Sequence, residues 1–136
     1  MAFVLDASLA LAWHFEDEGS AYADRVLGLL AHESAVVPSV WPLEIANGLA
    51  VAERRGRLMS VDVLRAAHLF LELPLAIREV PASVALGPVL ELARDQGLTA
   101  YDAAYLSLAL HEGLPLATED RELRAGATRV GVELLT

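Results

Sequence analysis

Four carboxylates stand in stretches of the chain that are otherwise apolar. Asp6, Glu44 and Asp102 are each the only Asp, Glu or Arg within a long surrounding segment. Asp120 is less isolated, because other acidic residues flank it. Burying a lone carboxylate is unfavourable unless a partner compensates its charge. Segments that resemble protein core therefore carry three acidic side chains with no obvious cationic partner nearby in the sequence.

Carboxylates that converge on one point have a limited range of chemistry. Like charges within a few ångströms repel, so either some of them bind protons or a cation lies among them. Oxygen ligands suit hard cations such as Mg²⁺ or Mn²⁺, which also meet substrate phosphates. A cation so placed lowers the pKa of a water molecule and stabilises the leaving oxygen of a phosphodiester. This chemistry needs no lysine, cysteine or histidine.

Helix capping is the competing interpretation of the three aspartates, and taken singly each fits it slightly better than a site. Glu44 is harder to explain in this way, because it lies past the first turn of an apolar helix. The joint pattern of two strand ends and two helix starts favours one shared crevice. The caps would be Asp6 with Ser8, Asp102 with Thr99 in a capping box, and Asp120 or Thr118 at a later helix start.

Short apolar runs alternate with helical patterns along the chain. The expected strands are residues 2–5, 35–37, 75–80, 114–117 and, as a fifth, 130–135. The expected helices cover 8–15, 22–30, 39–55, 60–71, 82–95 and 99–111, with one further turn near 120–124. This alternation predicts an α/β fold with a central parallel sheet of about five strands and helices on both faces. No repeat or linker interrupts it, so we expect a single domain over residues 1–136.

The boundaries of these elements follow from capping and breaking residues. Ser39 is expected to cap the helix that ends near Arg55, and Ser60 to cap the helix that ends near Leu71. The leucines of residues 27–30 and 69–73 could lie in the core or at an interface, and the core is the preferred interpretation. In parallel sheets the binding crevice lies beyond the carboxyl ends of the strands, which is where Asp6 and Asp120 are expected.

The charge balance excludes several functions. The chain has 10 basic and 19 acidic residues, a formal net charge of −9, and every basic residue is arginine. The absence of lysine removes P-loop phosphate binding and Schiff-base chemistry, and the absence of cysteine removes thiol catalysis and cysteine-based metal sites. Such an acidic chain is poorly suited to non-specific nucleic-acid binding. Contact with nucleic acid would depend on metal ions or on a local arginine cluster.

Apolar residues make up 55% of the chain, which raises the question of membrane insertion. The longest stretch without a formal charge, residues 80–90, is too short to span a bilayer and contains two prolines. No positively charged segment precedes an apolar run near Met1. We therefore expect a soluble, cytoplasmic protein without membrane association.

Other motifs carry weaker signals. The four histidines lack zinc-site spacing, no serine lies in a GxSxG context, and no nucleotide-binding glycine fingerprint is present. Arg54, Arg55 and Arg57 form the one local basic cluster. As the end of a helix they would interact favourably with its dipole, and the alternative is contact with phosphates beside the crevice.

Four segments resemble, in order, the motifs of PIN-domain ribonucleases, specifically those of VapC-like toxins. The third segment is the most specific, and the four in this order extend over essentially the whole chain. Any one of them alone would be weak. They are Val4-Leu5-Asp6-Ala7-Ser8, Pro42-Leu43-Glu44-Ile45-Ala46-Asn47, Leu98-Thr99-Ala100-Tyr101-Asp102-Ala103-Ala104-Tyr105-Leu106 and Leu116-Ala117-Thr118-Glu119-Asp120-Arg121-Glu122-Leu123.

The resemblance implies a catalytic acidic quartet that holds Mg²⁺ or Mn²⁺. Asp6 and Asp102 would be the principal metal ligands. Glu44 and Asp120 would act directly, through water or at a second ion. Hydroxyl and amide side chains would orient these carboxylates, namely those of Ser8, Asn47 and Thr118.

The resemblance also implies a PIN fold, a homodimer, and endonucleolytic cleavage of RNA that leaves a 5′-phosphate and a 3′-hydroxyl. VapC-like toxins are inhibited by a cognate antitoxin whose tail covers the acidic crevice, and a net charge of −9 would suit a basic partner segment. One alternative is a nuclease or phosphatase on the same fold with a non-toxin role. Another is a non-catalytic dimerisation or partner-binding module, although an inactive scaffold would gain stability by losing buried repulsion. The target RNA and the cut site cannot be read from the sequence.

Overall fold

A four-stranded parallel sheet forms the centre of the molecule. The computed structural model describes residues 2–136, and the strand order is β3-β2-β1-β4. Val4 of the central strand pairs with Val36 on one side and Leu116 on the other. The strands are β1 (Phe3–Leu5), β2 (Ala35–Pro38), β3 (Leu75–Arg78) and β4 (Leu116–Ala117).

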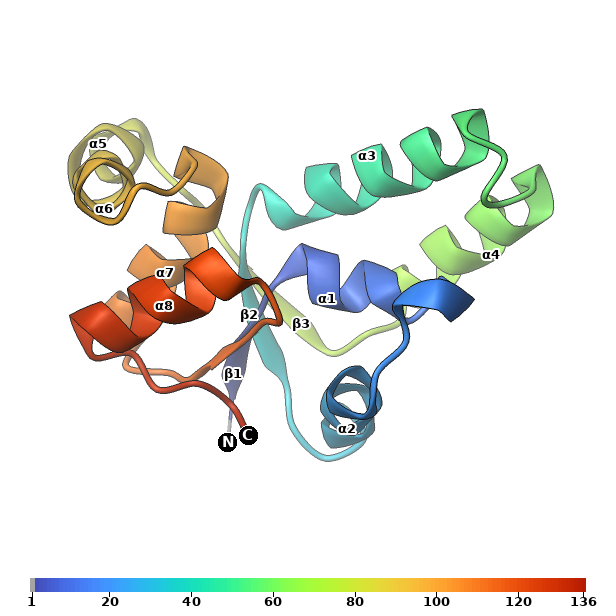
Figure 1. Cartoon of the computed structure of the whole chain (residues 1–136), viewed down its shortest axis with the longest axis horizontal. Coiled ribbons are helices and arrows are strands. Elements are labelled where there is room, and N and C mark those ends of the chain that lie inside the picture. The colour runs from blue at the N-terminus through green and yellow to red at the C-terminus, as the bar shows by residue number, and fades with distance from the viewer. Residues whose placement is uncertain (1) are drawn as a thin grey trace.

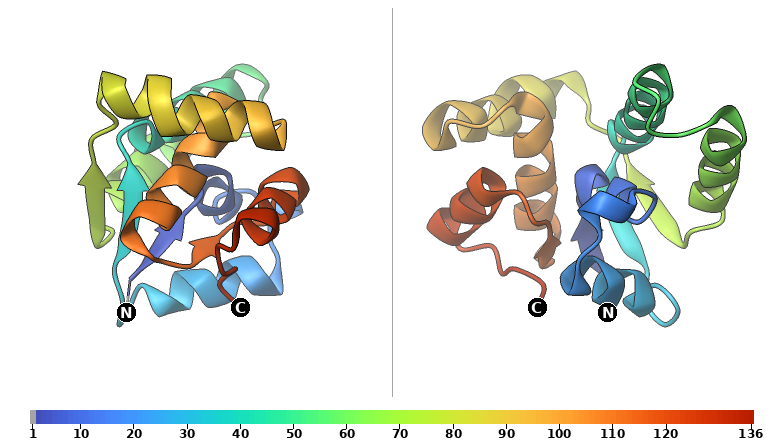
Figure 2. Two further views of the ribbon diagram at one scale, coloured as in Figure 1. Left: turned by 90° about the vertical axis from the view of Figure 1, so that its left-hand side faces the viewer. Right: turned by 45° about the vertical axis from the view of Figure 1, so that its right-hand side comes forward.

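Helices cover both faces of this sheet. Figures 1 and 2 show α1 to α4 on one side of the strands and α5 to α8 on the other. Burial on both faces explains why β1, β2 and β4 read as continuous apolar runs rather than as alternating ones. The helices are α1 (Ala7–Ala12), the 3₁₀-helix η1 (Glu16–Glu18), α2 (Ala21–Leu29), α3 (Trp41–Arg54), α4 (Ser60–Leu71), α5 (Ala82–Val84), the π-helix η2 (Ala85–Val89), α6 (Leu90–Gln96), α7 (Ala100–Glu112) and α8 (Arg121–Val130).

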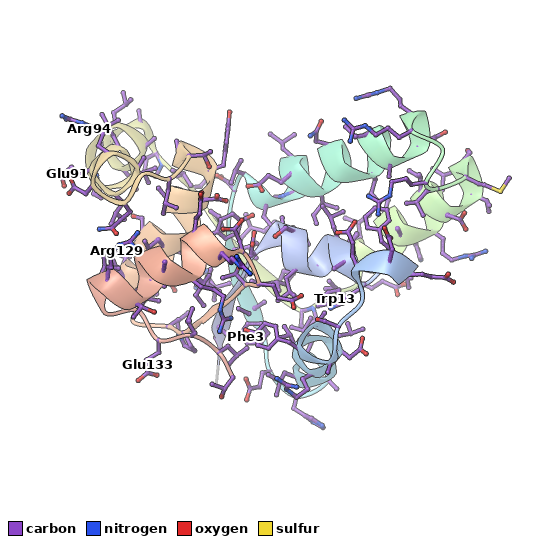
Figure 3. All side chains as sticks on the ribbon, in the orientation of Figure 1. Phe3, Trp13, Glu91, Arg94, Arg129 and Glu133 are labelled. Carbon is purple, nitrogen blue, oxygen red and sulfur yellow. The ribbon has the colours of Figure 1, made fainter. Side chains whose placement is uncertain are left out.

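The core gathers around β1 and α7. Phe3 is fully buried and lies in the middle of the molecule, between the two helical layers (Figure 3). Helix α7 packs on β1, β2 and β4, and its buried face includes Tyr105 and Leu106. Because Thr99 caps α7 and Asp102 lies in its first turn, this packing brings an acidic side chain to the sheet.

The predicted α/β fold with a parallel sheet and helices on both faces is confirmed. The expected fifth strand is reduced to an isolated parallel bridge between Leu134 and Leu116. Two backbone hydrogen bonds of Leu116, with Glu133 and Leu135, hold this C-terminal segment beside β4. Residue 130 belongs instead to α8, which extends well beyond the single turn expected near residue 120.

Both predicted serine caps are wrong. Helix α3 begins after Val40, without a side-chain cap, and Ser39 Oγ accepts a hydrogen bond from the Val80 N–H at 3.2 Å. Helix α4 has Met59 at its N-cap position, and the carboxylate of Asp62 accepts the Met59 N–H. The direction from which the chain enters a helix decides whether a serine side chain can cap it. The local sequence does not specify this direction.

Two other expectations differ from the structure. The helix expected over residues 82–95 is interrupted by η2, which contains Pro88, a residue that cannot donate the usual helical hydrogen bond. The expected burial of the leucine-rich segments is wrong in part, since Leu71 is 86% exposed and Leu69 is 45% exposed on the outer face of α4. None of the helices within residues 2–136 is long and apolar enough to cross a membrane.

Candidate active site

The candidate site lies where the order of the strands reverses. The chain passes from β1 outward to β2 and β3, and then returns to place β4 on the other side of β1. Parallel sheets bind ligands at such a switch point, beyond the carboxyl ends of the strands. Asp6 directly follows β1, and Thr118 and Asp120 follow β4. In Figure 1, α1, α3 and α8 all start near the centre of the view, close to this end of the strands.

Asp6 is buried, with 3% of its surface exposed, and it forms no ion pair with residues 2–136. The Ser8 and Thr118 hydroxyls both donate to its Oδ2 at 2.7 Å, and the Ser8 N–H donates to its Oδ1 at 3.3 Å. Burial raises the pKa of Asp6, these hydrogen bonds oppose the rise, and the nearby charge of Asp120 adds to it. The same carboxylate caps α1. Helix capping and a place in the candidate site are therefore compatible for Asp6.

Glu44 reaches the same region from the first turn of α3. The prediction that it lies past the first turn is wrong, because α3 begins at Trp41 rather than directly after Ser39. Its Oε1 accepts a hydrogen bond of 3.2 Å from the hydroxyl of Tyr105, a fully buried residue of α7. Burial raises the pKa of Glu44 to about 7, and the charges of Asp6 and Asp102 contribute to the rise. Burial likewise raises the pKa of Tyr105, so its hydroxyl remains a neutral donor at all working pH values.

Asp102 and Asp120 complete the group from the first turn of α7 and the start of α8. Burial raises the pKa of Asp102 to about 6, with contributions from Asp6 and Asp120. The Asp102 N–H donates to the hydroxyl of Thr99, which caps α7. Asp120 caps α8 by accepting the Leu123 N–H at 2.9 Å. Charge interactions therefore link Asp6 and Asp102 to each other, and each of them to both Glu44 and Asp120.

No arginine neutralises this group within the described part of the chain. The ion pairs of residues 2–136 all involve other acidic residues. Arg124 follows Asp120 by four residues, but its Nη1 donates to the Thr118 carbonyl at 2.7 Å. Arg94 and Arg129 lie at the outer ends of α6 and α8 (Figure 3). The acidic charge is left uncompensated by the protein itself.

The donor set fits a hard divalent cation. Its ligands are carboxylate oxygens, oriented by neutral hydroxyls, and their mutual repulsion is what a cation would relieve. As the side chains stand, no three His, Asp or Glu groups among residues 2–136 already lie close enough to enclose an ion. The structure thus brings the four predicted residues to the switch point of the sheet, at the range of charge interaction rather than of direct ligation.

The three residues predicted to orient the carboxylates differ in their contacts. Ser8 and Thr118 contact Asp6 directly, and Thr118 also accepts the Asp120 N–H at 3.1 Å. Asn47 is exposed on α3 and makes no side-chain hydrogen bond with residues 2–136. Sequence reasoning gave no role to Tyr105. The signal for it was a tyrosine three residues after Asp102 in an apolar helix, because a buried tyrosine hydroxyl usually has a partner.

The arginine cluster lies at the far end of α3 from the site. Arg57 pairs with Asp17 and Glu18, and its guanidinium stacks over the Phe15 ring at 4.3 Å. Arg54 lies in the last turn of α3, as the dipole interpretation expects. Ten residues of helix separate it from Glu44, about 15 Å at the usual rise per residue. Contact of this cluster with phosphate stays a prediction.

Comparison with known proteins identifies the family. Residues 3–128 match the PIN domain family, so the chain belongs to that family. The chain is 31% identical over 123 residues to ribonuclease VapC3 of Pyrobaculum aerophilum, covering 90% of this chain and 92% of that protein. It is 35% identical over 120 residues to ribonuclease VapC9 of Mycobacterium tuberculosis, covering 88% and 87%.

Solved structures agree on the fold. The crystal structure of PAE2754 from Pyrobaculum aerophilum superposes with a TM-score of 0.70 at 29% identity, covering 93% of this chain and 79% of that one. VapBC2 from Rickettsia felis, solved with a DNA fragment from its promoter, gives a TM-score of 0.68 at 17% identity and covers 99% and 98%. The predicted resemblance to PIN-domain proteins of the VapC type is confirmed.

Proposed function

We propose that this chain is a divalent-metal-dependent endoribonuclease that acts as the toxin of a toxin–antitoxin pair. The observation that carries the proposal is the meeting of Asp6, Glu44, Asp102 and Asp120 at the switch point of the sheet. The pKa values of Asp6, Glu44 and Asp102 are raised, and no cationic side chain of residues 2–136 forms an ion pair with any of the four. The family and the VapC ribonucleases similar to this chain support it. The 136 residues would act as one domain.

The four carboxylates would hold Mg²⁺ or Mn²⁺. When bound, such an ion supplies an activated water molecule and stabilises the leaving oxygen of a phosphodiester. Asp6 and Asp102 would be its principal ligands. Glu44 and Asp120 would ligate the same ion, act through water or bind a second one. The hydroxyls of Ser8 and Thr118 donate hydrogen bonds to Asp6, which hold its carboxylate in place without neutralising its charge.

A cytoplasmic homodimer is the proposed working form, with RNA as substrate and an antitoxin as inhibitor. The chain carries a net charge of −9, and the crevice itself is acidic. A basic antitoxin segment that covers the crevice would therefore be attracted to it. The same charge repels RNA, so the enzyme depends on its metal and on a few arginines to bind substrate.

RNA cleavage by the purified protein tests the activity. Wild-type protein is expected to cut RNA with Mg²⁺ or Mn²⁺ and to stop when EDTA is added. Asp102→Asn is expected to cut no better than the EDTA-treated wild type. Asp24→Asn, on the exposed face of α2, serves as the matched control and should cut normally. Cleavage that persists in EDTA, or in the Asp102→Asn variant, would contradict a catalytic metal site at these carboxylates.

Expression in cells tests the toxin role. Wild-type protein is expected to arrest growth, Asp6→Asn to permit it, and co-expression of a binding partner to restore it. Growth arrest by Asp6→Asn at wild-type protein level would contradict a metal-dependent toxin. Normal growth with active purified enzyme would favour a nuclease with a non-toxin role.

A further inference from the structure

The hydroxyl of Tyr105 connects the candidate site to the core. The side chain is fully buried in α7, and its hydroxyl donates to Oε1 of Glu44 at 3.2 Å across 61 positions in the chain. The backbone N–H of Ala7 faces the same hydroxyl from the start of α1, one residue after Asp6. This hydroxyl thus contacts one of the four carboxylates and lies beside the segment that carries a second.

This contact holds Glu44 by one oxygen. Its Oε1 accepts the Tyr105 hydroxyl, whereas Oε2 accepts no hydrogen bond from residues 2–136. Phenylalanine would fill the same space in the core but could not donate. The hydroxyl is therefore not required for packing, and its partner is a carboxylate of the site rather than a backbone carbonyl.

The donor is also neutral, which matters for a cation-binding group. An arginine in this place would fix Glu44 but would cancel its charge and repel a bound cation. A hydroxyl fixes the carboxylate and leaves the charge in place. Asp6 is held in the same manner by the hydroxyls of Ser8 and Thr118. Neutral donors therefore hold both the buried carboxylate of Asp6 and the half-buried carboxylate of Glu44.

We propose that Tyr105 is a positioning residue that fixes Glu44 relative to Asp6 for binding of a divalent cation. The inference rests on the proposed function, because Tyr105 has this role only if the quartet binds metal. Hydrogen-bonded partners of metal ligands commonly change metal affinity by about 10- to 100-fold when they are removed. The predicted consequence is a loss of affinity without loss of the fold.

Calorimetric titration with Mn²⁺ in the absence of RNA provides the first test. Tyr105→Phe is expected to raise the Mn²⁺ dissociation constant by about 10- to 100-fold. Tyr101→Phe is the matched control, since it removes a hydroxyl from the same helix one turn earlier, from a side chain that is 62% exposed. It should bind Mn²⁺ as the wild type does. Wild-type affinity in Tyr105→Phe would overturn the inference.

A double-mutant cycle separates positioning from a general effect on structure. If Tyr105 acts through Glu44, Tyr105→Phe should change the Mn²⁺ affinity of wild-type protein but not that of Glu44→Gln. Equal losses in both backgrounds would overturn the inference while leaving the metal site intact. A wild-type protein that binds no Mn²⁺ would instead overturn the proposed function together with this inference.

A third measurement uses the wild-type side chains and does not depend on how Tyr105→Phe folds. The chain contains three tyrosines, so 3-fluorotyrosine labelling should give three ¹⁹F resonances, assigned with Tyr22→Phe and Tyr101→Phe. Saturating Mg²⁺ is expected to shift the Tyr105 resonance and to leave that of Tyr101 in place. Mg²⁺ binding seen by calorimetry without a shift at Tyr105 would overturn the inference.

Discussion

Individual carboxylates in this protein have two roles at once. Asp6 caps α1 and also faces the charge of Asp120, and Asp120 itself caps α8. Capping explains why aspartate is tolerated at each place, because an N-cap oxygen accepts backbone N–H groups. It does not explain why the caps converge and remain without a cation. Convergence is what distinguishes a site from a set of helix starts.

Thr118→Val tests how much Asp6 depends on its neutral donors. The substitution keeps the shape but removes a 2.7 Å hydrogen bond to a buried carboxylate. We expect a loss of about 1–3 kcal/mol in the free energy of unfolding and a Mn²⁺ affinity lower by about 10- to 100-fold. Urea unfolding and calorimetric titration measure these. Thr128→Val, on the exposed face of α8, should leave both unchanged, and an equal effect there would contradict a specific role for Thr118.

Asp6→Asn should stabilise the metal-free protein. Asparagine caps helices about as well as aspartate, and the substitution removes a buried negative charge that repels Asp120. In EDTA at pH 8 we expect a melting temperature higher by roughly 3 °C or more. With saturating Mn²⁺ the order should reverse, because only the wild type gains binding energy. Lower stability in EDTA would show that capping by the charged group dominates.

At the scale of elements, the contact between α1 and α3 sets the distance between Asp6 and Glu44. Gly48 of α3 faces Leu11 of α1, and a Cβ at this glycine would lie 2.5 Å from one Leu11 methyl carbon. Glycine therefore permits the two helices to approach closely. Glu44 lies one turn earlier on α3. The close packing of α3 against α1 therefore also affects the position of the Glu44 carboxylate relative to Asp6.

Gly48→Ala should destabilise the protein despite the better helix propensity of alanine. Alanine gains about 1 kcal/mol in an α-helix, whereas crowding in a packed interface costs about 1–3 kcal/mol. Gly28→Ala is the control, because nothing lies within 4 Å of its Cβ position, and it should stabilise by about 0.5–1 kcal/mol. Chemical denaturation compares the two. Equal stabilisation by both would show that Leu11 moves aside without cost.

The acidic groups of this protein are expected to make its stability fall as pH rises. The pKa of Glu44 is raised from 4.5 to about 7 and that of Asp102 from 3.8 to about 6, mainly by burial. Between these limits the folded state binds more protons than the unfolded state. The free energy of unfolding therefore falls as pH rises through this interval, and the loss is complete above the folded-state pKa values.

Calorimetric melting in EDTA should show this fall between pH 5 and pH 8. Glu44→Gln should flatten the curve, because it removes a group whose pKa burial raises from 4.5 to about 7. Stability that increases over the same range would contradict uncompensated carboxylates in the folded state.

Saturating Mn²⁺ should reverse the pH trend. The ion binds deprotonated carboxylates, so its affinity rises with pH. At a hundred times the dissociation constant it stabilises by about 2.7 kcal/mol. Melting the wild type with Mn²⁺ at pH 6 and pH 8 measures the effect. Mn²⁺ that stabilises no more at pH 8 than at pH 6 would place its binding site away from Glu44 and Asp102.

Patterns among neighbouring residues were enough to predict the alternation of strands and helices, the isolated positions of Asp6, Glu44 and Asp102, and the order of the four acidic motifs. These features depend on residues that are neighbours along the chain, such as an apolar run that ends at Asp6 or a glycine that ends α7 at residue 113. For this reason the parallel α/β fold and the identity of the candidate carboxylates could be predicted.

Only the tertiary structure decided which groups hold these carboxylates. Thr118 contacts Asp6 across 112 positions and Tyr105 contacts Glu44 across 61. Arg57 is engaged by Asp17, 40 positions away, rather than by the crevice. Ser39 bonds to Val80 instead of capping α3. Each of these contacts depends on the order of the strands and on the angles at which the helices cross. Periodicity and residue spacing do not specify that order or those angles. A hydrogen bond forms only when its two groups lie close together in the folded chain.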